Sequence, residues 1–202
     1  FLNEFEQHKP DYSNFKACHN YYPRLNTGIS LETCLSKNNL LKKYGIELSA
    51  FIPSLTHKRE PICEGLPTLE RHRFMEPQTA AKHLFAIGID DVYFGDSIPS
   101  DEEITSVGRL DENVLELRMD TYTDCEIEKN ILFGAVHQNR PDPAEDVIRS
   151  TASRESLPPG TKIKPYNNIE RDIGHVTIDN EGYLRYCGEL EICKKKLPKD
   201  RR

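Results

Sequence analysis

The sequence of 202 residues lacks any apolar run near the roughly 18 to 20 residues that a membrane-spanning helix needs, so we expect no membrane partner. It also lacks an excess of basic residues. Its 27 Lys and Arg stand against 33 Asp and Glu, which gives a net charge of -6 and argues against nucleic acid as the main partner. The six cysteines and seven histidines show no metal-ligand spacing, and no Gly-rich nucleotide loop occurs. We therefore expect neither a metal nor a cofactor.

The first residues of the given sequence show no signal-peptide pattern either. The sequence opens at Phe1, with no basic segment followed by an apolar one, so we expect an internal fragment or a processed chain. Scattered cysteines without a signal peptide favour a reducing cytoplasm, in which all six thiols stay reduced. Cys18 and Cys187 lie in apolar runs, which is typical of buried free thiols. The pattern gives no information on the oligomeric state.

The first half of the chain alternates between strand and helix patterns. We expect strands at 15–22, 46–52 and 91–96, and helices at about 31–44, from Pro77 to Ile87, and from Ser100 onward. Gly45 and Gly88 suit left-handed helix stops, and Ser100 with Glu103 forms a capping-box signature. Three such units make a parallel sheet with right-handed crossovers. The long loop between 53 and 67 is of a length that is usually functional or mobile.

The pattern changes between about 109 and 113, where we expect a break in architecture. Beyond it we find no helical period, and the chain reads as a small antiparallel β domain. The expected strands are 114–119, 126–133, 146–150, 162–166, 175–178 and 183–193. We therefore predict an α/β domain at 1–110 and a β domain at 111–202.

Polar side chains gather where the first strand ends. His19, Asn20, Tyr22 and Arg24 follow Cys18 directly, and the ends of parallel strands are where α/β folds build sites. An amide and an imidazole bond hydroxyls, Tyr stacks on an apolar sugar face, and Arg pairs with phosphate or carboxylate. The alternative is that these groups satisfy loop backbone and pack under a helix.

The chain resembles one bacterial glycosidase family, the 6-phospho-N-acetylmuramidases, formerly called outer surface proteins. The resemblance is carried by 18–24 (CHNYYPR), 27–30 (TGIS), 50–53 (AFIP), 64–70 (EGLPTLE), 147–150 (VIRS) and 186–190 (YCGEL). It implies the C-terminal part of a (β/α)8 TIM-type barrel, with its last three strand-helix units at 1–110, followed by a small cyclophilin-like β-barrel at 111–202.

The same resemblance implies an activity. It points to a glycoside hydrolase that cleaves 6-phospho-MurNAc-GlcNAc in peptidoglycan recycling, with this phosphorylated amino-sugar disaccharide as partner and a cytoplasmic location. Three strand units cannot enclose a barrel site, so we expect this length of chain to be inactive alone. The alternative is a non-catalytic module that binds a phosphosugar or a peptide.

Glycoside hydrolysis usually needs two carboxyl groups. Asp96 ends the third strand and Glu64 lies in the long loop, so both are candidate catalytic residues, and Glu70 is a further carboxylate near the site. The alternatives are a helix-entry role for Asp96, a solvated carboxylate at Glu64, and an N-acetyl group of the substrate that acts as the nucleophile.

A second basic cluster lies in the predicted β domain. Arg149 and Arg154 flank a run of hydroxyls that includes Ser150, a composition suited to a phosphate monoester or a lactyl carboxylate. We therefore expect Arg149, Ser150 and Arg154 to bind substrate. The alternative is a surface hairpin with salt bridges to Glu145, Asp146 and Glu155.

Overall fold

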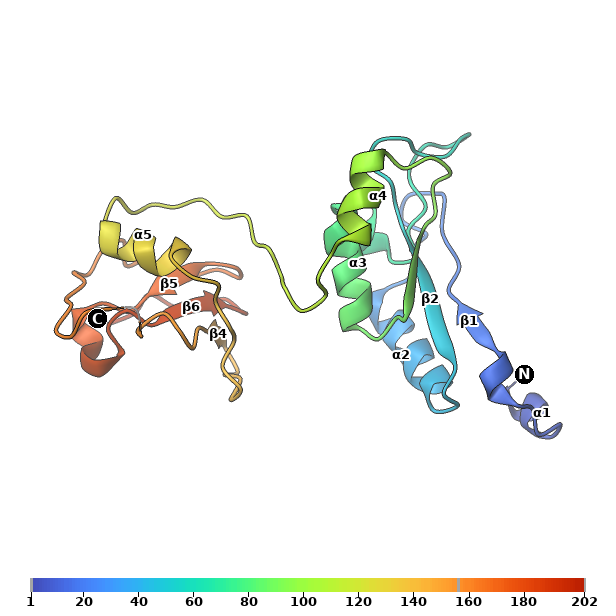
Figure 1. Cartoon of the computed structure of the whole chain (residues 1–202), viewed down its shortest axis with the longest axis horizontal. Coiled ribbons are helices and arrows are strands. Elements are labelled where there is room, and N and C mark those ends of the chain that lie inside the picture. Colours follow the sequence, from blue (N-terminus) through green and yellow to red (C-terminus); the bar gives the residue numbers. More distant parts are fainter. Residues whose placement is uncertain (1, 156, 202) are drawn as a thin grey trace. The chain divides into compact units, whose positions relative to one another are not determined.

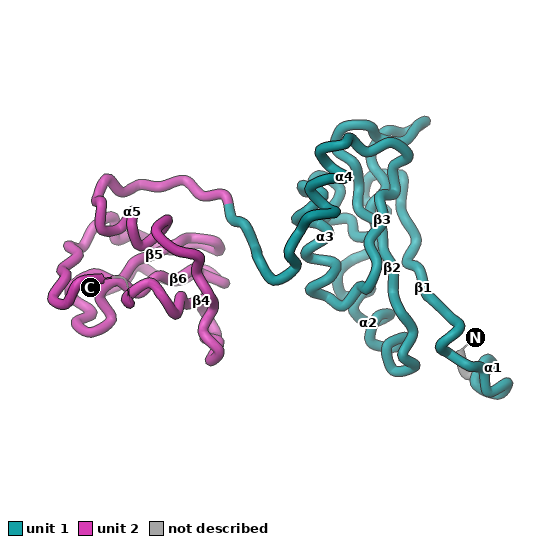
Figure 2. Tube along the Cα trace, viewed as in Figure 1, with its two compact units in different colours: residues 1–117 teal, residues 118–202 magenta. Residues whose placement is uncertain are grey.

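A computed structural model describes residues 2–155 and 157–201. The chain divides into two compact units, an N-terminal unit of residues 1–117 and a C-terminal unit of residues 118–202 (Figure 2). Each unit is built around its own sheet and its own cluster of buried apolar residues.

The N-terminal unit is a three-stranded parallel sheet in the order β1-β2-β3 (Figure 1). Its strands are β1 (Lys16–Cys18), β2 (Glu47–Ile52) and β3 (Asp91–Phe94). The α-helices of the unit are α1 (Leu2–Glu6), α2 (Leu31–Lys42), α3 (Pro77–Ala86) and α4 (Asp101–Gly108), with short 3-10 turns at Tyr12–Asn14 and Glu70–His72. α2, α3 and α4 follow β1, β2 and β3 along the chain, so the expected alternation and the parallel sheet are confirmed.

The two faces of this sheet differ because side chains alternate along a strand. In β2, Leu48, Ala50 and Ile52 are buried in a core shared with α2 and α3. Each large apolar side chain so buried contributes about 1.5–3 kcal/mol. Ser49 and Phe51 alternate with them on the opposite face.

Local signals in the sequence fix the helix ends of this unit. Gly45 and Gly88 have φ angles of +69° and +85°, as expected for left-handed helix stops. Pro77 opens α3, and the Ser100 side chain accepts a bond from the Glu103 amide while Glu103 bonds back, which completes the predicted capping box.

The C-terminal unit is a three-stranded antiparallel sheet in the order β4-β6-β5. Its elements are β4 (Val147–Arg149), β5 (Val176–Ile178), β6 (Leu190–Cys193), the helix α5 (Glu126–Phe133) and a 3-10 segment at Glu181–Tyr186. Ile131 of α5 packs with Leu190 and Ile163 in a small core. The expected change from parallel α/β to antiparallel β is therefore confirmed.

Several expectations for this half were wrong. Residues 126–133 form the helix α5, not a strand, and it buries Ile131, which lies four positions after Ile127. Segments 114–119 and 162–166 are not strands. Of 183–193 only β6 pairs in the sheet, because a 3-10 segment occupies its start. Ile163 is buried although its segment, 162–166, pairs with no strand, so a buried apolar residue there did not indicate a strand.

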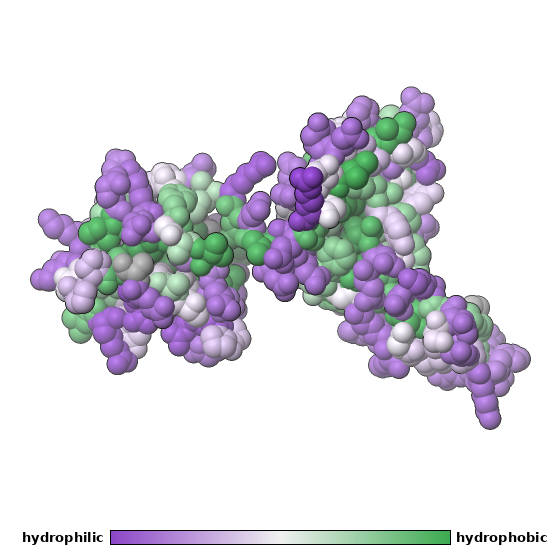
Figure 3. Space-filling model, in the orientation of Figure 1, coloured by the Kyte–Doolittle hydropathy of each residue, from purple (hydrophilic) through white to green (hydrophobic). Residues whose placement is uncertain are grey.

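The chain is thus a mixed α/β protein with a parallel sheet and a separate antiparallel sheet of three strands. None of the helices in the described residues is long and apolar enough to cross a membrane. On the face of each unit seen in Figure 3, apolar residues form small patches among hydrophilic ones.

Candidate functional site at the carboxyl ends of the parallel strands

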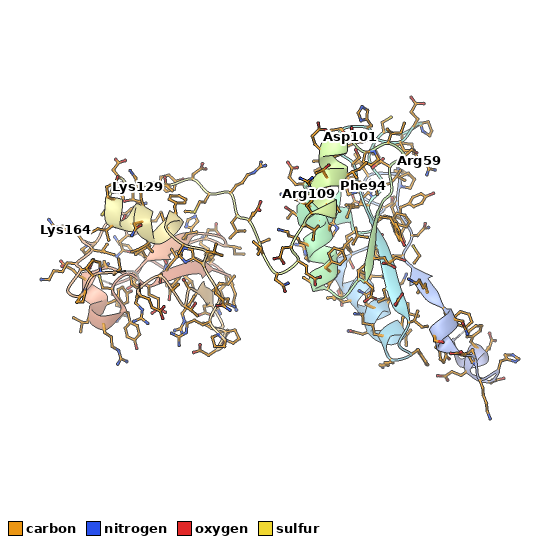
Figure 4. The ribbon with its side chains drawn as sticks, in the orientation of Figure 1. Arg59, Phe94, Asp101, Arg109, Lys129 and Lys164 are labelled. Carbon is orange, nitrogen blue, oxygen red and sulfur yellow. The ribbon has the colours of Figure 1, made fainter. Side chains whose placement is uncertain are left out.

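Three loops meet at the edge of the parallel sheet where its strands end. They follow β1 at 19–29, β2 at 53–69 and β3 at 95–99. Phe94 at the end of β3, Arg59 in the second loop and Asp101 at the start of α4 lie toward this same end of the unit (Figure 4). This is the place where the sequence predicted a site.

Asp96 holds the long loop through its backbone. Its carboxylate, 3% exposed, accepts hydrogen bonds from the amides of Ser54 (2.8 Å), Arg59 (2.7 Å) and Leu66 (3.3 Å). Bonds from backbone amides to a carboxylate are charge-assisted and stronger than neutral ones. The predicted catalytic Asp96 therefore fixes the loop between β2 and α3 at three points.

Glu103 at the start of α4 fastens the same loop a second time. Its carboxylate accepts the Leu55 amide at 2.7 Å and the hydroxyls of Ser54 and Thr56 at 2.7 and 2.9 Å. These bonds, with that from Ser100, lower its pKa against the opposing effect of burial. The capping residue of α4 thus also positions the candidate site.

Arg73 joins the first loop to the second. Its side chain is completely buried, and Nη1 donates to the carbonyls of Tyr22 (3.0 Å) and Gly65 (2.9 Å), while Nη2 donates to that of Arg24 (3.0 Å). A guanidinium presents five N–H donors in one plane, so a single side chain can serve both loops. Its position fixes the backbone that carries the predicted Tyr22 and Arg24.

Glu70 completes this hub. Its two oxygens accept Nε and Nη2 of Arg73 at 2.7 Å each, and also the amides of Asn26 and Gly28 at 2.9 and 2.7 Å. These bonds, that to Arg73 above all, lower the pKa of Glu70 to about 2. Glu70 is therefore ionised at neutral pH and is committed to the loop structure.

Glu64, the second predicted catalytic carboxylate, is half-buried in the same region. Its Oε2 accepts the amide of Leu25 at 2.5 Å, and its carbonyl accepts Arg73 Nη1 at 3.2 Å. Both predicted catalytic carboxylates therefore lie in the loops at the strand ends, and both bind backbone amides there.

His19 is buried at the end of β1, with 8% of its surface exposed. Its Nε2 lies 2.7 Å from Oδ1 of Asn38 and 3.7 Å from the sulfur of Cys34, both on α2. Burial raises the pKa of the Cys34 thiol. Cys18, expected to be buried, is instead exposed, because it lies on the face of the sheet opposite the helices.

The side chains after His19 are more accessible. Asn20 is exposed and accepts the amide of Tyr21 at 3.0 Å, whereas Tyr22 is half-buried. Arg24 is exposed, and within the described residues its guanidinium makes no hydrogen bond or ion pair. Arg59 lies over the ring of Tyr21, with 5.3 Å from Cζ to the ring centroid. The first loop therefore presents an amide, aromatic rings and the Arg24 guanidinium, and the second loop adds the guanidinium of Arg59.

The C-terminal unit holds the other predicted residues. Arg149 and Arg154 approach opposite oxygens of Glu189, with Nε–O distances of 3.5 and 3.3 Å, and Glu189 is 2% exposed. Arg154 also donates to the carbonyl of Arg185 at 2.8 Å. Ser150 Oγ contacts His137 Nδ1 at 2.8 Å. Arg149 and Arg154 are thus grouped around one buried carboxylate.

Neither the main hollow nor a search for metal ligands points to the predicted site residues. A hollow of about 660 Å³ lies among α3, α4 and residues 110–116, and none of the predicted site residues lines it. Among residues 2–155 and 157–201, no three His, Cys, Asp or Glu side chains are grouped as metal ligands.

A family model described as "6-phospho-N-acetylmuramidase, N-terminal" matches residues 1–109, and the corresponding C-terminal model matches residues 115–202. The chain belongs to the 6-phospho-N-acetylmuramidase family. A search of curated proteins returned no match. The loops at the strand ends, with Asp96, Glu70 and Arg73, lie in the part matched by the N-terminal family model, and the group around Glu189 lies in the other.

Two crystal structures resemble this family member. One is of an uncharacterised B. cereus protein, with a TM-score of 0.83, 34% identity and coverage of 100% of this chain. The other is of a conserved Enterococcus faecalis protein, with a TM-score of 0.72, 37% identity and 98% coverage. The chain spans 59% and 54% of the lengths of these two proteins.

Sequence reasoning missed three residues that organise the site of this muramidase-family chain. Arg73 carries no signal, because most of its partners are backbone carbonyls. Asn38 sits in a helix where nothing marks it as buried. Glu103 was visible as a capping residue, but its bonds to the Ser54–Thr56 turn depend on the fold.

Proposed function

We propose that this chain carries a substrate-binding part of a muramidase-type glycosidase that cleaves 6-phospho-MurNAc-GlcNAc in peptidoglycan recycling. The observation that carries the proposal is the match of the two family models to 1–109 and 115–202. Phosphorylated amino sugars are found in the cytoplasm, so we propose a cytoplasmic location for the protein. A TIM-type barrel and a cyclophilin-like barrel, of which the two units are parts, belong to the same proposal.

The loop geometry supports sugar binding at the strand ends. His19, Asn20 and Tyr22 offer hydrogen-bonding groups and an aromatic ring beside one another in sequence, on a backbone held by Arg73. Arg24 supplies an exposed guanidinium with no hydrogen bond or ion pair among the described residues. In the proposal, His19, Asn20 and Tyr22 contact the sugar, and Arg24 binds its phosphate.

Asp96 and Glu64 are the proposed catalytic carboxylates. Asp96 Oδ1 and Glu64 Oε2 each accept one backbone amide and keep a second lone pair for a substrate proton or hydroxyl, whereas Asp96 Oδ2 accepts two amides. Glu64 is the more exposed of the two. We propose Glu64 as the group that exchanges protons with solvent and Asp96 as the fixed carboxylate.

In the C-terminal unit, Arg149, Ser150 and Arg154 are the proposed ligand-binding residues. Each arginine has one nitrogen within ion-pair distance of Glu189, and both side chains are partly exposed, 25% for Arg149 and 34% for Arg154. Guanidiniums positioned in this way suit a carboxylate or a phosphate.

The test measures binding and cleavage of the disaccharide in its phosphorylated and unphosphorylated forms. We expect the chain to bind the phosphorylated form more tightly, by calorimetry. Equal binding of both forms, or of neither, would contradict the proposal. Mass spectrometry detects cleavage. We expect none from the 202-residue chain, because its parallel sheet has three strands, and cleavage only in the whole protein.

A second candidate function is a non-catalytic phosphosugar-binding module. It is favoured by one observation: Asp96 and Glu64 both use their carboxylates to hold loop backbone. Binding of the phosphorylated disaccharide without cleavage by the whole protein would support this second function.

A further inference from the structure

His19 and Asn38 form a buried pair whose hydrogens can be assigned. Asn38 is 1% exposed, and its Nδ2 lies 3.2 Å from the carbonyl oxygen of Ile87. A carbonyl oxygen only accepts, so the side of the amide that faces Ile87 is the NH₂ group. The other side, Oδ1, faces Nε2 of His19 at 2.7 Å.

Because Oδ1 of Asn38 only accepts, the Nε2 atom of His19 must donate to it. A neutral imidazole carries one N–H, so the remaining nitrogen, Nδ1, is the acceptor. The carbonyl of Ile87, reached through Asn38, thus selects one tautomer of His19.

The second neighbour of Nε2 agrees with this assignment. Cys34 lies 3.7 Å from Nε2 and 3.9 Å from Oδ1 of Asn38, and burial raises the pKa of its thiol. A protonated thiol is a weak donor, and Oδ1 has two lone pairs to accept both groups. On the backbone, the amide of His19 donates to the carbonyl of Ser49 at 2.8 Å, which ties the residue to β2.

Nδ1 of His19 has no hydrogen-bond partner among the described residues, and it is not one of their fully buried unpaired atoms. It therefore keeps access to solvent at the end of β1. Asn38 fixes the tautomer of the imidazole, and its acceptor nitrogen Nδ1 is unpaired. The imidazole can therefore accept a hydrogen bond from a donor group.

We propose that Asn38 is a positioning residue that holds His19 in the Nε2–H tautomer, so that Nδ1 accepts a hydrogen bond from a hydroxyl or amide N–H of the ligand. This inference rests on the proposed function for the identity of the ligand, an N-acetylated amino sugar 6-phosphate. An acceptor nitrogen has no proton to offer a phosphate oxygen. In this proposal His19 contacts the sugar, and arginine binds the phosphate.

The first experiment does not involve a ligand. Long-range ¹H–¹⁵N NMR of the 202-residue chain at pH 8, above the ordinary titration range of histidine, reports the tautomer of each neutral imidazole. We expect His19 as the Nε2–H form. An Nδ1–H form, or a mixture of the two, would overturn the role of Asn38.

Three variants separate positioning from stability. In Asn38→Leu the acceptor is removed, and we expect a tautomer mixture. Asn38→Asp retains an acceptor oxygen and should restore the Nε2–H form. Cys34→Ala removes the other neighbour of Nε2 and should leave the tautomer unchanged. A single Nε2–H tautomer in folded Asn38→Leu, with folding checked by circular dichroism, would contradict the proposal.

The second experiment adds N-acetylmuramic acid 6-phosphate, or inorganic phosphate as the control. We expect the sugar to shift the ¹⁵N resonance of His19 Nδ1 and phosphate alone to leave it in place. We also expect Asn38→Leu to weaken sugar binding roughly 2- to 13-fold, the range for one neutral hydrogen bond. Sugar binding without a shift at Nδ1 would overturn the acceptor role. Absence of sugar binding would overturn it together with the proposed function, while the tautomer result would stand.

Discussion

Arg73 and Glu70 face each other through two hydrogen bonds of 2.7 Å, from Nε and Nη2 to the two carboxylate oxygens. The pair lies three residues apart, with Arg73 wholly buried and the Glu70 side chain 29% exposed. Each partner then reaches into the loops: Arg73 to carbonyl oxygens and Glu70 to amides. One ion pair therefore satisfies backbone donors and acceptors together at the candidate site.

Arg73→Met should destabilise the N-terminal unit by about 3 kcal/mol. The substitution removes the Arg73 donors from several carbonyl groups and leaves the Glu70 carboxylate with only its two amide donors. Breaking a buried ion pair costs about 3–5 kcal/mol. Because Glu70 is partly exposed, we expect a loss of stability at the lower end of this range. Urea unfolding, followed by pulse labelling of the buried thiol of Cys34, measures the stability of this unit.

The matched control for this change is Arg71→Met, since Arg71 is exposed and two residues away. Exposed substitutions of this kind usually stay within about 0.5 kcal/mol. Arg73→Lys should recover only part of the loss, because an ammonium cannot reproduce the planar fork. Equal stability of the Met variants at 71 and 73 would show that the hub is not needed for folding.

The stability of the N-terminal unit should fall as the pH drops below 6.5. Burial lowers the pKa of His72 to about 3, with further effects of His83 and Arg71, and its Nε2 contacts His83 Nδ1 at 2.7 Å. Between pH 6.5 and 3 the unfolded chain binds a proton that the folded chain does not. Stability therefore declines by up to about 1.4 kcal/mol per pH unit for this group.

His72→Gln should remove much of this decline, and His57→Gln, at an exposed position, should not. The same Cys34 labelling in urea between pH 5 and 7.5 provides the comparison. An unchanged slope in His72→Gln would show that another group causes the loss.

Asp179 in the C-terminal unit gives the opposite pH dependence. Burial and the charges of Glu191, Glu189 and Asp200 raise its pKa to about 7. Between pH 4 and 7 the folded chain binds the extra proton, so stability is lost as the pH rises. Asp179→Asn should stabilise this unit at pH 8 by about 1–2 kcal/mol, allowing for residual solvent screening, and by little at pH 4.5.

Labelling of Cys193, buried in the C-terminal unit, follows this transition. The control is Asp124→Asn, an exposed carboxylate of the same unit. A stabilisation of equal size at pH 4.5 and pH 8 would mean that the charge of Asp179 is not its cause.

Much of the N-terminal unit could be predicted because its signals are local. The alternation in β2, Pro77 at the start of α3 and the Ser100 capping box each depend on neighbouring residues. The helix α5 resembles a strand in sequence because its two Ile residues and its Phe favour strands, and its eight residues suit either element.

The candidate site likewise has features that the sequence predicts and others that only the fold shows. The position of His19 follows from strand order, since the carboxyl ends of parallel strands share one edge. The contacts of Arg73 with Tyr22 and of Asn38 with Ile87 could not be predicted, because they join distant parts of the chain and a carbonyl group has no signature in the sequence. Buried polar residues of this kind appear only once the fold is known.

Cysteine reactivity should divide by burial. Cys18, Cys63 and Cys125 are exposed, whereas Cys34 and Cys193 are buried, and burial raises the pKa of both buried thiols. Because the thiolate is the reactive form, native alkylation at pH 7.5 should label the exposed three first. Mass spectrometry of peptides gives the order. Early labelling of Cys34 would contradict the burial of this residue of α2.

Arg24→Ala should weaken binding of the phosphorylated disaccharide far more than binding of the unphosphorylated form. The Arg24 carbonyl accepts a hydrogen bond from Arg73 Nη2 at 3.0 Å, while the Arg24 guanidinium is exposed and makes no hydrogen bond or ion pair among the described residues. The backbone is thus fixed and the charged group is available. A charge-assisted contact contributes about 1.5–3 kcal/mol, or roughly 10- to 150-fold in affinity.

Arg59→Ala is the matched comparison for Arg24, since it removes a guanidinium of the same region. Arg59 already lies over the Tyr21 ring, and its Nη1 donates to the Tyr21 hydroxyl at 3.3 Å. We expect this substitution to reduce binding of both disaccharides to a similar extent, because it disturbs an aromatic side chain and leaves the phosphate contact intact. Calorimetry with the two disaccharides separates the effects. If Arg24→Ala lowers both affinities equally, Arg24 has a structural role and the phosphate binds elsewhere.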